Sequence, residues 1–328
     1  MEKHRIHKKN VNNPAVWAFS GPRLFMKKER THKQLLYNPK SAAWVLAAPG
    51  LVLLSIFVIL PFLIAIYYSF TNRMLVQPSS IATEFVGFRN YLRVFTDPIF
   101  SESFLNNFYF AIFAVPIQLV LSLLLALLVN KKVKGISIFR FIFFSPAVIP
   151  MIVIAVAWSL LLTPGESGLL NTILNELTFG HFRPLDWLFN KNVALNGLIV
   201  MCVWMSVGFQ MMILLAALQS VPQELLEAAV LDGANAFQRF RHVILPELRN
   251  SIIFLVLSST IGSFKLFGQV FILTKGGPQN STSTIVYMIY EKGFINQQLG
   301  YASAIAVVVF LVVGILSFIQ QRVIKLTD

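Results

Sequence analysis

Residues able to do chemistry are few in this sequence, and the best placed of them is a lysine in an apolar stretch. Lys265 lies just after Ser263 and shortly before Gln269. A charge at the centre of a membrane helix costs at least about 2.5–3.5 kcal/mol, so such a residue usually faces a cavity or a partner. Lys265 is therefore a candidate contact for an anionic ligand. The alternatives are that it pairs with a neighbouring membrane subunit or snorkels to the membrane surface.

The other titratable residues do not form the pattern of a catalytic or metal centre. The histidines lack metal-ligand spacing, and Glu166 and Asp186 have no partner visible in the sequence. The single cysteine, Cys202, can form no internal disulfide. The sequence also lacks the G-x-x-x-x-G-K-[ST] phosphate loop of nucleotide-binding proteins. We therefore expect no catalysis, no metal site and no cofactor in this chain.

The composition is that of a membrane protein. Of the 328 residues, 56% are hydrophobic and 12% are charged, whereas soluble domains are about 25% charged. A helix needs about 20 apolar residues to cross the hydrocarbon core. Six runs meet this length: Trp44–Tyr67, Phe108–Leu128, Phe139–Leu162, Ala194–Leu218, Ile252–Leu273 and Ala302–Ile324. The sequence therefore predicts an all-α integral membrane protein with six transmembrane helices.

The distribution of positive charge predicts how these helices are oriented. Lys and Arg concentrate before residue 41, after the second run, after the fourth run and at the C-terminus. With six crossings these segments share one side, which the positive-inside rule makes cytoplasmic. Both termini are thus expected in the cytoplasm, and the net charge of +13 reflects orientation in the bilayer rather than nucleic-acid binding.

Two regions are expected. Residues 1–41 form a basic cytoplasmic N-terminal extension, and residues 42–328 form the transmembrane domain. The extension is either a mobile tail or a short helix on the inner leaflet.

One cytoplasmic loop, residues 220–247, is too patterned to be a simple connector. Ser220 with Gln223, and Asn235 with Gln238, have the spacing of two capping boxes. Gly233 lies between them and can adopt the left-handed conformation that ends a helix. The pattern predicts two short helices joined at a glycine. The mixed charges of the loop favour a protein partner over an anionic lipid surface.

This loop resembles the EAA motif of binding-protein-dependent ABC importer permeases. The resemblance rests on Glu227, Ala228, Ala229, Gly233 and the pair Leu245-Pro246, all at the motif's spacing. Val243 stands where the motif usually has isoleucine. In the family this helix docks into a cleft of the ATPase. The resemblance implies that Glu227 pairs with a basic group there, that the alanines allow close approach and that the chain turns away at Gly233.

A second block resembles the carbohydrate-uptake branch, and within it the maltose and glycerol-phosphate type. It comprises Leu273-Thr274-Lys275-Gly276-Gly277-Pro278 and Gly300-Tyr301-Ala302-Ser303-Ala304. This resemblance implies the type I importer fold and the first permease of a heterodimer. Aligned from Glu227, the sugar-contacting positions of the maltose permease fall on Met205, Ser206, Phe209, Ser259, Ser263 and Leu266. The maltose-type asparagines are missing, so these residues are either a substrate path or ordinary packing residues.

The resemblance implies the following assembly. The chain would be a permease subunit in a bacterial inner membrane, paired with a second homologous permease, two ATP-binding subunits that hold ATP and Mg, and an extracytoplasmic solute-binding protein. It would import a sugar or oligosaccharide by alternating access, and Lys265 would suit an acidic one such as a uronate oligosaccharide. The alternative is an ion-gradient-driven secondary transporter, although the runs contain almost no carboxylate.

Overall fold

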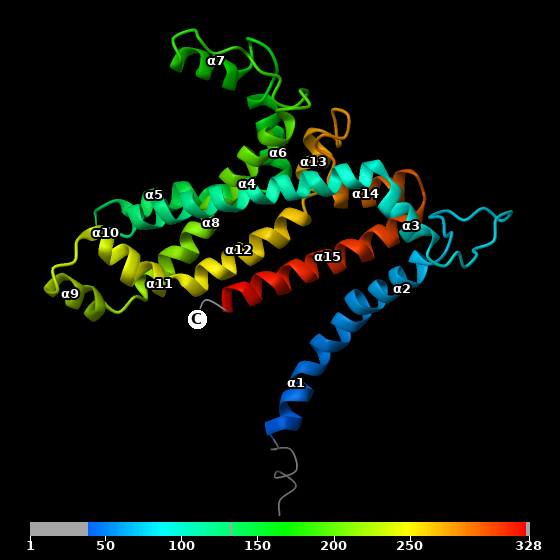
Figure 1. Cartoon of the computed structure of the whole chain (residues 1–328), viewed down its shortest axis with the longest axis horizontal. Helices are drawn as coiled ribbons and strands as arrows, with labels where there is room; N and C mark the ends of the chain where they lie inside the picture. The colour runs from blue at the N-terminus through cyan, green and yellow to red at the C-terminus, as the bar shows by residue number, and fades with distance from the viewer. Residues whose placement is uncertain (1–38, 132, 326–328) are drawn as a thin grey trace, which may run out of the picture. The chain divides into compact units, whose positions relative to one another are not determined.

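The computed structural model describes residues 39–131 and 133–325, and helices dominate this part of the chain (Figure 1). The predicted N-terminal extension lies outside the described residues up to position 38. Contacts divide the chain into two units, Met1–Ile59 and Leu60–Asp328. The first contains α1 (Pro39–Leu54) and the π-helical turn η2 (Ser55–Ile59). The second contains all the other helices of the described chain.

The second unit is built on a few long helices. These are α2 (Leu60–Ser69), α4 (Pro98–Val129), α8 (Ala194–Gln219), α12 (Arg249–Phe264) and α15 (Leu299–Lys325). Shorter elements connect them: α3 (Arg89–Thr96), α5 (Ile136–Phe144), η3 (Ser145–Ala147), α6 (Met151–Leu161), α7 (Leu169–Leu177), α9 (Gln223–Leu231), α10 (Ala236–Arg239), η4 (Phe240–Ile244), α11 (Leu245–Glu247), α13 (Gly268–Leu273), α14 (Ile285–Tyr290) and η5 (Glu291–Ile295).

Between four and six segments of the described chain could cross a membrane by length and composition, against the six predicted runs. Four helices are long and apolar enough to cross a membrane: Leu46–Ser69, Pro98–Val129, Ala194–Gln219 and Leu299–Arg322. Two bent helix pairs complete the six if each pair is one span: Ile136–Ala147 with Met151–Leu161, and Ala236–Glu247 with Arg249–Phe264. The all-α prediction is confirmed.

Two of the predicted runs are wrong in detail. The third is not one helix, because the chain bends by 94° between η3 and α6. Pro150 precedes α6 there and has no N–H to continue a helix. The fifth does not extend to Leu273, because α12 ends at Phe264 and the chain resumes a helix only at Gly268.

The core of this unit forms around α8. Of its most apolar window, 61% is buried, which is more than in any other candidate span of the described chain. Its neighbours include α4, α5 and α12. The crossing with α5 depends on Gly208, because an added Cβ would lie 1.9 Å from the carbonyl oxygen of Phe143. Small residues at such crossings let helix backbones approach closely.

Replacing Gly208 tests this contact. We expect Gly208→Ala to destabilise the protein by about 1–3 kcal/mol, because the new methyl group meets backbone that cannot move aside cheaply. The matched control is Gly262→Ala on α12, where an added Cβ meets nothing within 4 Å. Thermal unfolding of the detergent-solubilised chain measures both. Equal unfolding temperatures for the two variants would contradict the close packing of α5 on α8.

Candidate functional site

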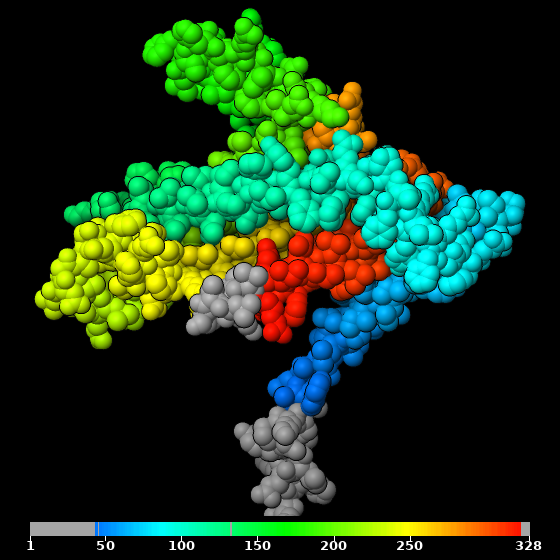
Figure 2. Space-filling view, viewed as in Figure 1, coloured from blue at the N-terminus to red at the C-terminus, as the bar shows by residue number. Residues whose placement is uncertain are grey.

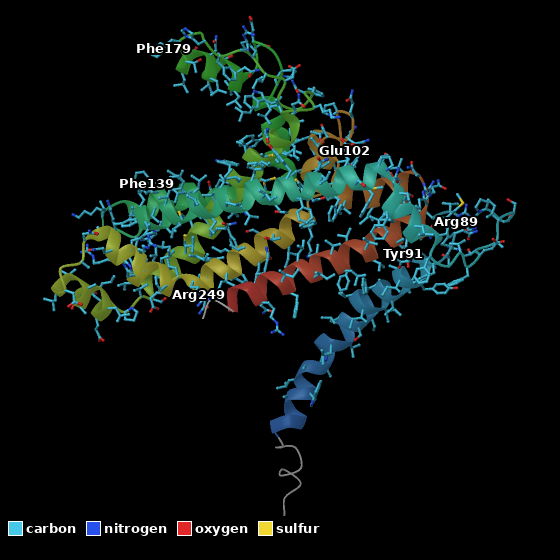
Figure 3. All side chains as sticks on the ribbon, in the orientation of Figure 1. Arg89, Tyr91, Glu102, Phe139, Phe179 and Arg249 are labelled. Atoms are coloured by element: carbon cyan, nitrogen blue, oxygen red, sulfur yellow. The ribbon has the colours of Figure 1, made fainter. Side chains whose placement is uncertain are left out.

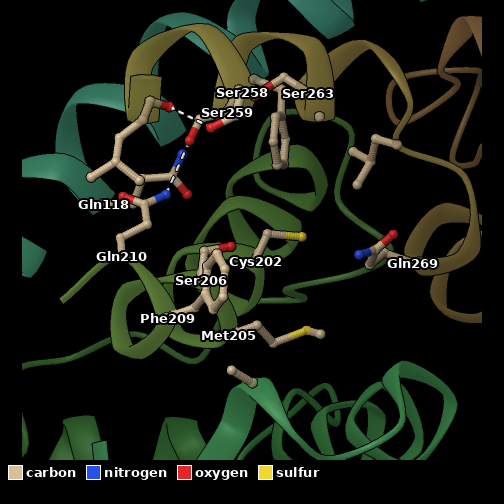
Figure 4. Close-up of a pocket in the computed structure, with 15 residues that line it drawn as sticks. Gln118, Cys202, Met205, Ser206, Phe209, Gln210, Ser258, Ser259, Ser263 and Gln269 are labelled. Atoms are coloured by element: carbon tan, nitrogen blue, oxygen red, sulfur yellow. Dashed lines mark hydrogen bonds between the residues drawn. The ribbon is translucent and has the colours of Figure 1, made fainter. Parts of the chain in front are cut away.

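A cavity of about 420 Å³ lies between α4, α8 and α12 (Figure 4). Its lining includes six of the seven residues predicted for a substrate path: Met205, Ser206, Phe209, Ser259, Ser263 and Leu266. These come from two segments far apart in sequence, so the fold brings the predicted set together. The remaining lining residues are Phe110, Gln118, Ala147, Cys202, Gln210, Leu255, Ser258, Gly262 and Gln269.

Hydroxyl and amide groups give the cavity a polar side. The amide nitrogen of Gln210 donates to the hydroxyl of Ser259 at 3.0 Å, which links α8 to α12. The Ser263 hydroxyl donates to the carbonyl of Ser259 at 2.9 Å. No charged side chain is among the lining residues that the structure describes. The site can therefore hydrogen-bond a neutral polar ligand and place it against the half-exposed ring of Phe209.

Sequence reasoning missed two of the three glutamines that line this cavity. Gln118 on α4 and Gln210 on α8 are 6% and 5% exposed. The Ser122 hydroxyl lies 3.4 Å from the side-chain oxygen of Gln210 and donates to the carbonyl of Val207 at 3.1 Å. The signal was present, because a glutamine within a long apolar run must find a partner or a cavity.

Lys265 does not line this cavity. It follows the last residue of α12 and its side chain is exposed. The prediction that it lies well inside a membrane-spanning helix is therefore wrong. The reason is that α12 is shorter than the apolar run, so the lysine falls at the helix end.

The backbone released by this helix end is paired with side chains from distant segments. The buried Asn107 of α4 donates its amide to the carbonyl of Ser263 at 2.7 Å and accepts from the N–H of Ile285 at 2.9 Å. The buried Thr284 hydroxyl donates to the carbonyl of Leu266 at 2.6 Å. Irregular backbone within a membrane is tolerated only where such partners satisfy it. The break beside the cavity is therefore held by specific hydrogen bonds from distant residues.

The block Gly276-Gly277-Pro278 follows this break, in the chain between α13 and α14. Thr282 donates its hydroxyl to the carbonyl of Gly277 at 2.7 Å, which folds the block into a compact turn. Gly276 has φ +79°, and an added Cβ would lie 2.8 Å from the ring of Tyr287. Glycine is therefore required at this position.

The loop 220–247 forms the two predicted short helices, α9 and α10. The predicted start of the second helix is confirmed, because Asn235 and Gln238 make both hydrogen bonds of a capping box. The predicted capping box at Ser220 is wrong. The Ser220 hydroxyl donates to the carbonyl of Ala217 and ends α8, so α9 begins after Pro222 without a side-chain cap. Gly233 has φ +79°, which confirms the left-handed turn between the helices.

The surface of this loop presents the carboxylate of Glu227 close to exposed apolar side chains. Glu227 is exposed and accepts a hydrogen bond from Gln223 at 2.9 Å. Val230, Leu231 and Phe237 are exposed large hydrophobic side chains. Ala228, Leu245 and Pro246 are exposed too, and Ala229 is half-buried. Exposed apolar groups rimmed by polar residues mark contact surfaces.

Residues 99–325 match the family model of the binding-protein-dependent transport system inner membrane component. The chain belongs to this family. It is therefore a permease, the membrane-embedded translocation subunit of an ABC importer rather than an enzyme, and a multi-pass inner-membrane protein. The family also decides against the ion-gradient-driven alternative, because ATPase subunits and a binding protein work with such permeases.

Curated relatives match almost their whole length. The permease is 34% identical over 290 residues to the probable ABC transporter permease protein YurN of Bacillus subtilis (strain 168), covering 87% of this chain and 97% of that protein. It is 32% identical over 290 residues to the trehalose/maltose transport system permease protein MalF of Thermococcus litoralis, covering 88% and 96%.

A solved structure shares the fold. It is that of a bacterial alginate ABC transporter in complex with alginate pentasaccharide-bound periplasmic protein. The TM-score is 0.72 at 21% identity, over 88% of this chain and 96% of that chain. The type I importer fold expected from the resemblance is thereby confirmed.

Asn107 offers a direct test of the break in the permease. We expect Asn107→Leu to destabilise the protein by about 1–3 kcal/mol, because a buried carbonyl and a buried N–H both lose their partner. The control is Asn196→Leu, which removes only an exposed hydrogen bond from Tyr109. Thermal unfolding in detergent measures both variants. If Asn107→Leu unfolds at the wild-type temperature, the amide does not hold the break.

Proposed function

We propose that this permease imports a saccharide through the cavity between α8 and α12. The observation that carries the proposal is the lining itself, which combines serine hydroxyls, glutamine amides and the Phe209 ring without a described charge. An aromatic ring stacks on the apolar face of a sugar, and hydroxyls and amides hydrogen-bond its OH groups. The names of two relatives support the same class, one a trehalose/maltose permease and the other an arabinooligosaccharides permease of Bacillus subtilis that is 30% identical.

The loop 220–247 is the proposed link to ATP hydrolysis. Two ATP-binding subunits hold ATP and Mg, and α9 seats in one of them. Glu227 pairs with a basic group there, the small Ala228 and Ala229 allow close approach, and Gly233, Leu245 and Pro246 shape the loop. The exposure of Glu227 and of the neighbouring apolar side chains supports this role.

Alternating access follows from this link. ATP closes the ATPase dimer, α9 moves as a rigid lever, and the helices around the cavity open outward. Hydrolysis then resets the inward-facing state. A second homologous permease completes the pathway beside this cavity.

In this proposal both termini lie in the cytoplasm. Figure 1 shows the end of α15 on the same side of the bundle as α9 and α10, and α3 and α14 on the other. This arrangement supports an intracellular loop 220–247 and an extracytoplasmic α3.

The segment 163–193 is the proposed contact for the binding protein. Asn171 shapes it, donating to the carbonyls of Gly165 and Leu185 and accepting from the indole N–H of Trp187 at 2.7 Å. Phe179, labelled in Figure 3 at the tip of this segment, is 90% exposed. An exposed aromatic side chain on a braced loop is typical of a contact surface.

An acidic oligosaccharide is the second candidate, because the exposed Lys265 directly precedes Leu266 of the cavity lining. If the substrate is acidic, Lys265→Met should lower uptake of a uronate oligosaccharide into proteoliposomes about tenfold, by removing one charge contact. Uptake of a neutral oligosaccharide should stay unchanged. The assembled importer with its binding protein is used. Uptake of neither class by the wild type would sink the saccharide proposal.

Coupling is tested by charge reversal on α9. In the co-purified complex, we expect Glu227→Lys to abolish stimulation of ATP hydrolysis by the loaded binding protein, because like charges repel across the contact. Glu224→Lys is the control, since Glu224 is exposed on the same helix. Equal activity of the two variants would show that Glu227 does not face the ATPase.

A further inference from the structure

A second cavity, of about 590 Å³, lies at the α3 end of the bundle and is rich in arginine. Arg73, Arg89 and Arg93 all line it. The other described lining residues are Thr71, Asn72, Met74, Val86, Asn90, Gln298 and Tyr301, so no carboxylate is among them. Three guanidinium groups around one hollow favour an anionic ligand. The proposed function strengthens this inference, because it makes this side extracytoplasmic, where the positive-inside rule disfavours arginine.

The fold holds these arginines in place. The carbonyl of Arg73 accepts from the N–H of Gly300 at 2.8 Å, and its guanidinium donates to Thr83 at 3.2 Å. Gly300 allows this approach, because an added Cβ would lie 2.1 Å from the carbonyl oxygen of Thr71.

The other two arginines belong to α3, one helical turn apart. The Arg93 guanidinium lies 4.0 Å above the centre of the Tyr301 ring. The Tyr301 hydroxyl donates to Asp97 at 2.7 Å, which fixes the ring. Arg89 is exposed beside the same cavity, and Figure 3 shows it next to Tyr91 on α3.

The cavity lies where helices leave the membrane. One candidate span ends at Ser69, directly before Thr71 and Arg73, and another begins at Leu299, between Gln298 and Tyr301. A third begins at Pro98, directly after α3. In the space-filling view the cyan segment that holds α3 forms the surface beside the start of α15 (Figure 2). The arginines therefore lie beside the ends of three candidate spans, and the ends of membrane-spanning helices are where lipid headgroups contact a protein.

The helix α3 also has a largely exposed apolar face, although the rings at its two ends touch other aromatic rings: Phe88 contacts Phe70, and Phe95 contacts Phe100. Phe88, Leu92 and Phe95 are 69%, 68% and 68% exposed. At about 100° per residue these three positions share one stripe, and Arg89 and Arg93 lie beside it. An amphipathic helix of this kind lies in the membrane interface, with its apolar face among the acyl chains.

We propose that this cavity binds the phosphate group of an anionic lipid headgroup. Guanidinium groups bind phosphate oxygens through paired hydrogen bonds. The adjacent apolar stripe accommodates the acyl chains, which a soluble phosphate lacks. The side-chain oxygen of Gln298, another lining residue, has no hydrogen-bond partner within the described residues.

Native mass spectrometry of the assembled importer, in mixed micelles with equimolar phosphatidylglycerol and phosphatidylcholine, tests the proposal. The wild type should retain phosphatidylglycerol selectively. Arg89→Gln with Arg93→Gln should lower that retention about twenty-five-fold, at about a factor of five for each arginine. Arg183→Gln, which removes a charge from the exposed segment 163–193, should leave retention unchanged.

Two further measurements keep the test decisive. Arg89→Gln alone should lower retention about fivefold. Because the Arg89 side chain is exposed, this substitution should leave the fold intact, so a loss of retention reports on lipid binding. Titration of a delipidated sample with inorganic phosphate distinguishes a lipid phosphate from a soluble phosphate as the ligand. Equal retention of both lipids by the wild type, or unchanged retention in the double variant, overturns the proposal. Arginine-dependent binding of inorganic phosphate without lipid selectivity also overturns it, in favour of a soluble anion.

Discussion

The amide of Asn107 is the contact on which the arrangement around the cavity depends. Through its two hydrogen bonds, α4 holds both the end of α12 and the start of α14. The chain between these helices is irregular over residues that hydropathy places inside the membrane, where unpaired backbone groups are costly. With Asn107 and Thr284 as partners, the break costs little, and α12 can stop beside a hollow instead of continuing through the bilayer.

The need to pair buried polar groups also explains the polar side of the cavity. Gln210 on the buried helix α8 cannot reach water easily, so it pairs with Ser259 across to α12. This pair brings the two helices together while leaving the hydroxyls of Ser206 and Ser263 to line the cavity. In the loop 220–247, by contrast, α9 and α10 keep charged and apolar side chains exposed. One unit thus carries both a cavity with a polar side and the exposed loop proposed to couple it to ATP hydrolysis.

Sequence patterns predicted the elements whose signals are local. The run Ala194–Leu218 ends within one residue of α8, because that helix is continuously apolar, and the Asn235–Gln238 capping box is complete within its own turn. The patterns failed where partners are distant, and where one residue could serve either of two adjacent helices. Nothing near Phe264 shows that Asn107, more than 150 positions earlier, will pair the released carbonyl. Ser220 has a capping spacing, but the preceding helix uses it as its end. The cavity residues came from a family resemblance, and only the fold added Gln118 and Gln210.

The most direct test of the central claim, that this cavity is the translocation pathway, is thiol accessibility in the assembled importer. Ser206→Cys is placed in a Cys202→Ala background, and a membrane-impermeant thiol reagent is added from the extracytoplasmic side. The account predicts labelling with ATP trapped on the ATPase subunits, little labelling without ATP, and protection by the transported saccharide. Labelling that is the same in both nucleotide states and insensitive to the saccharide would contradict it.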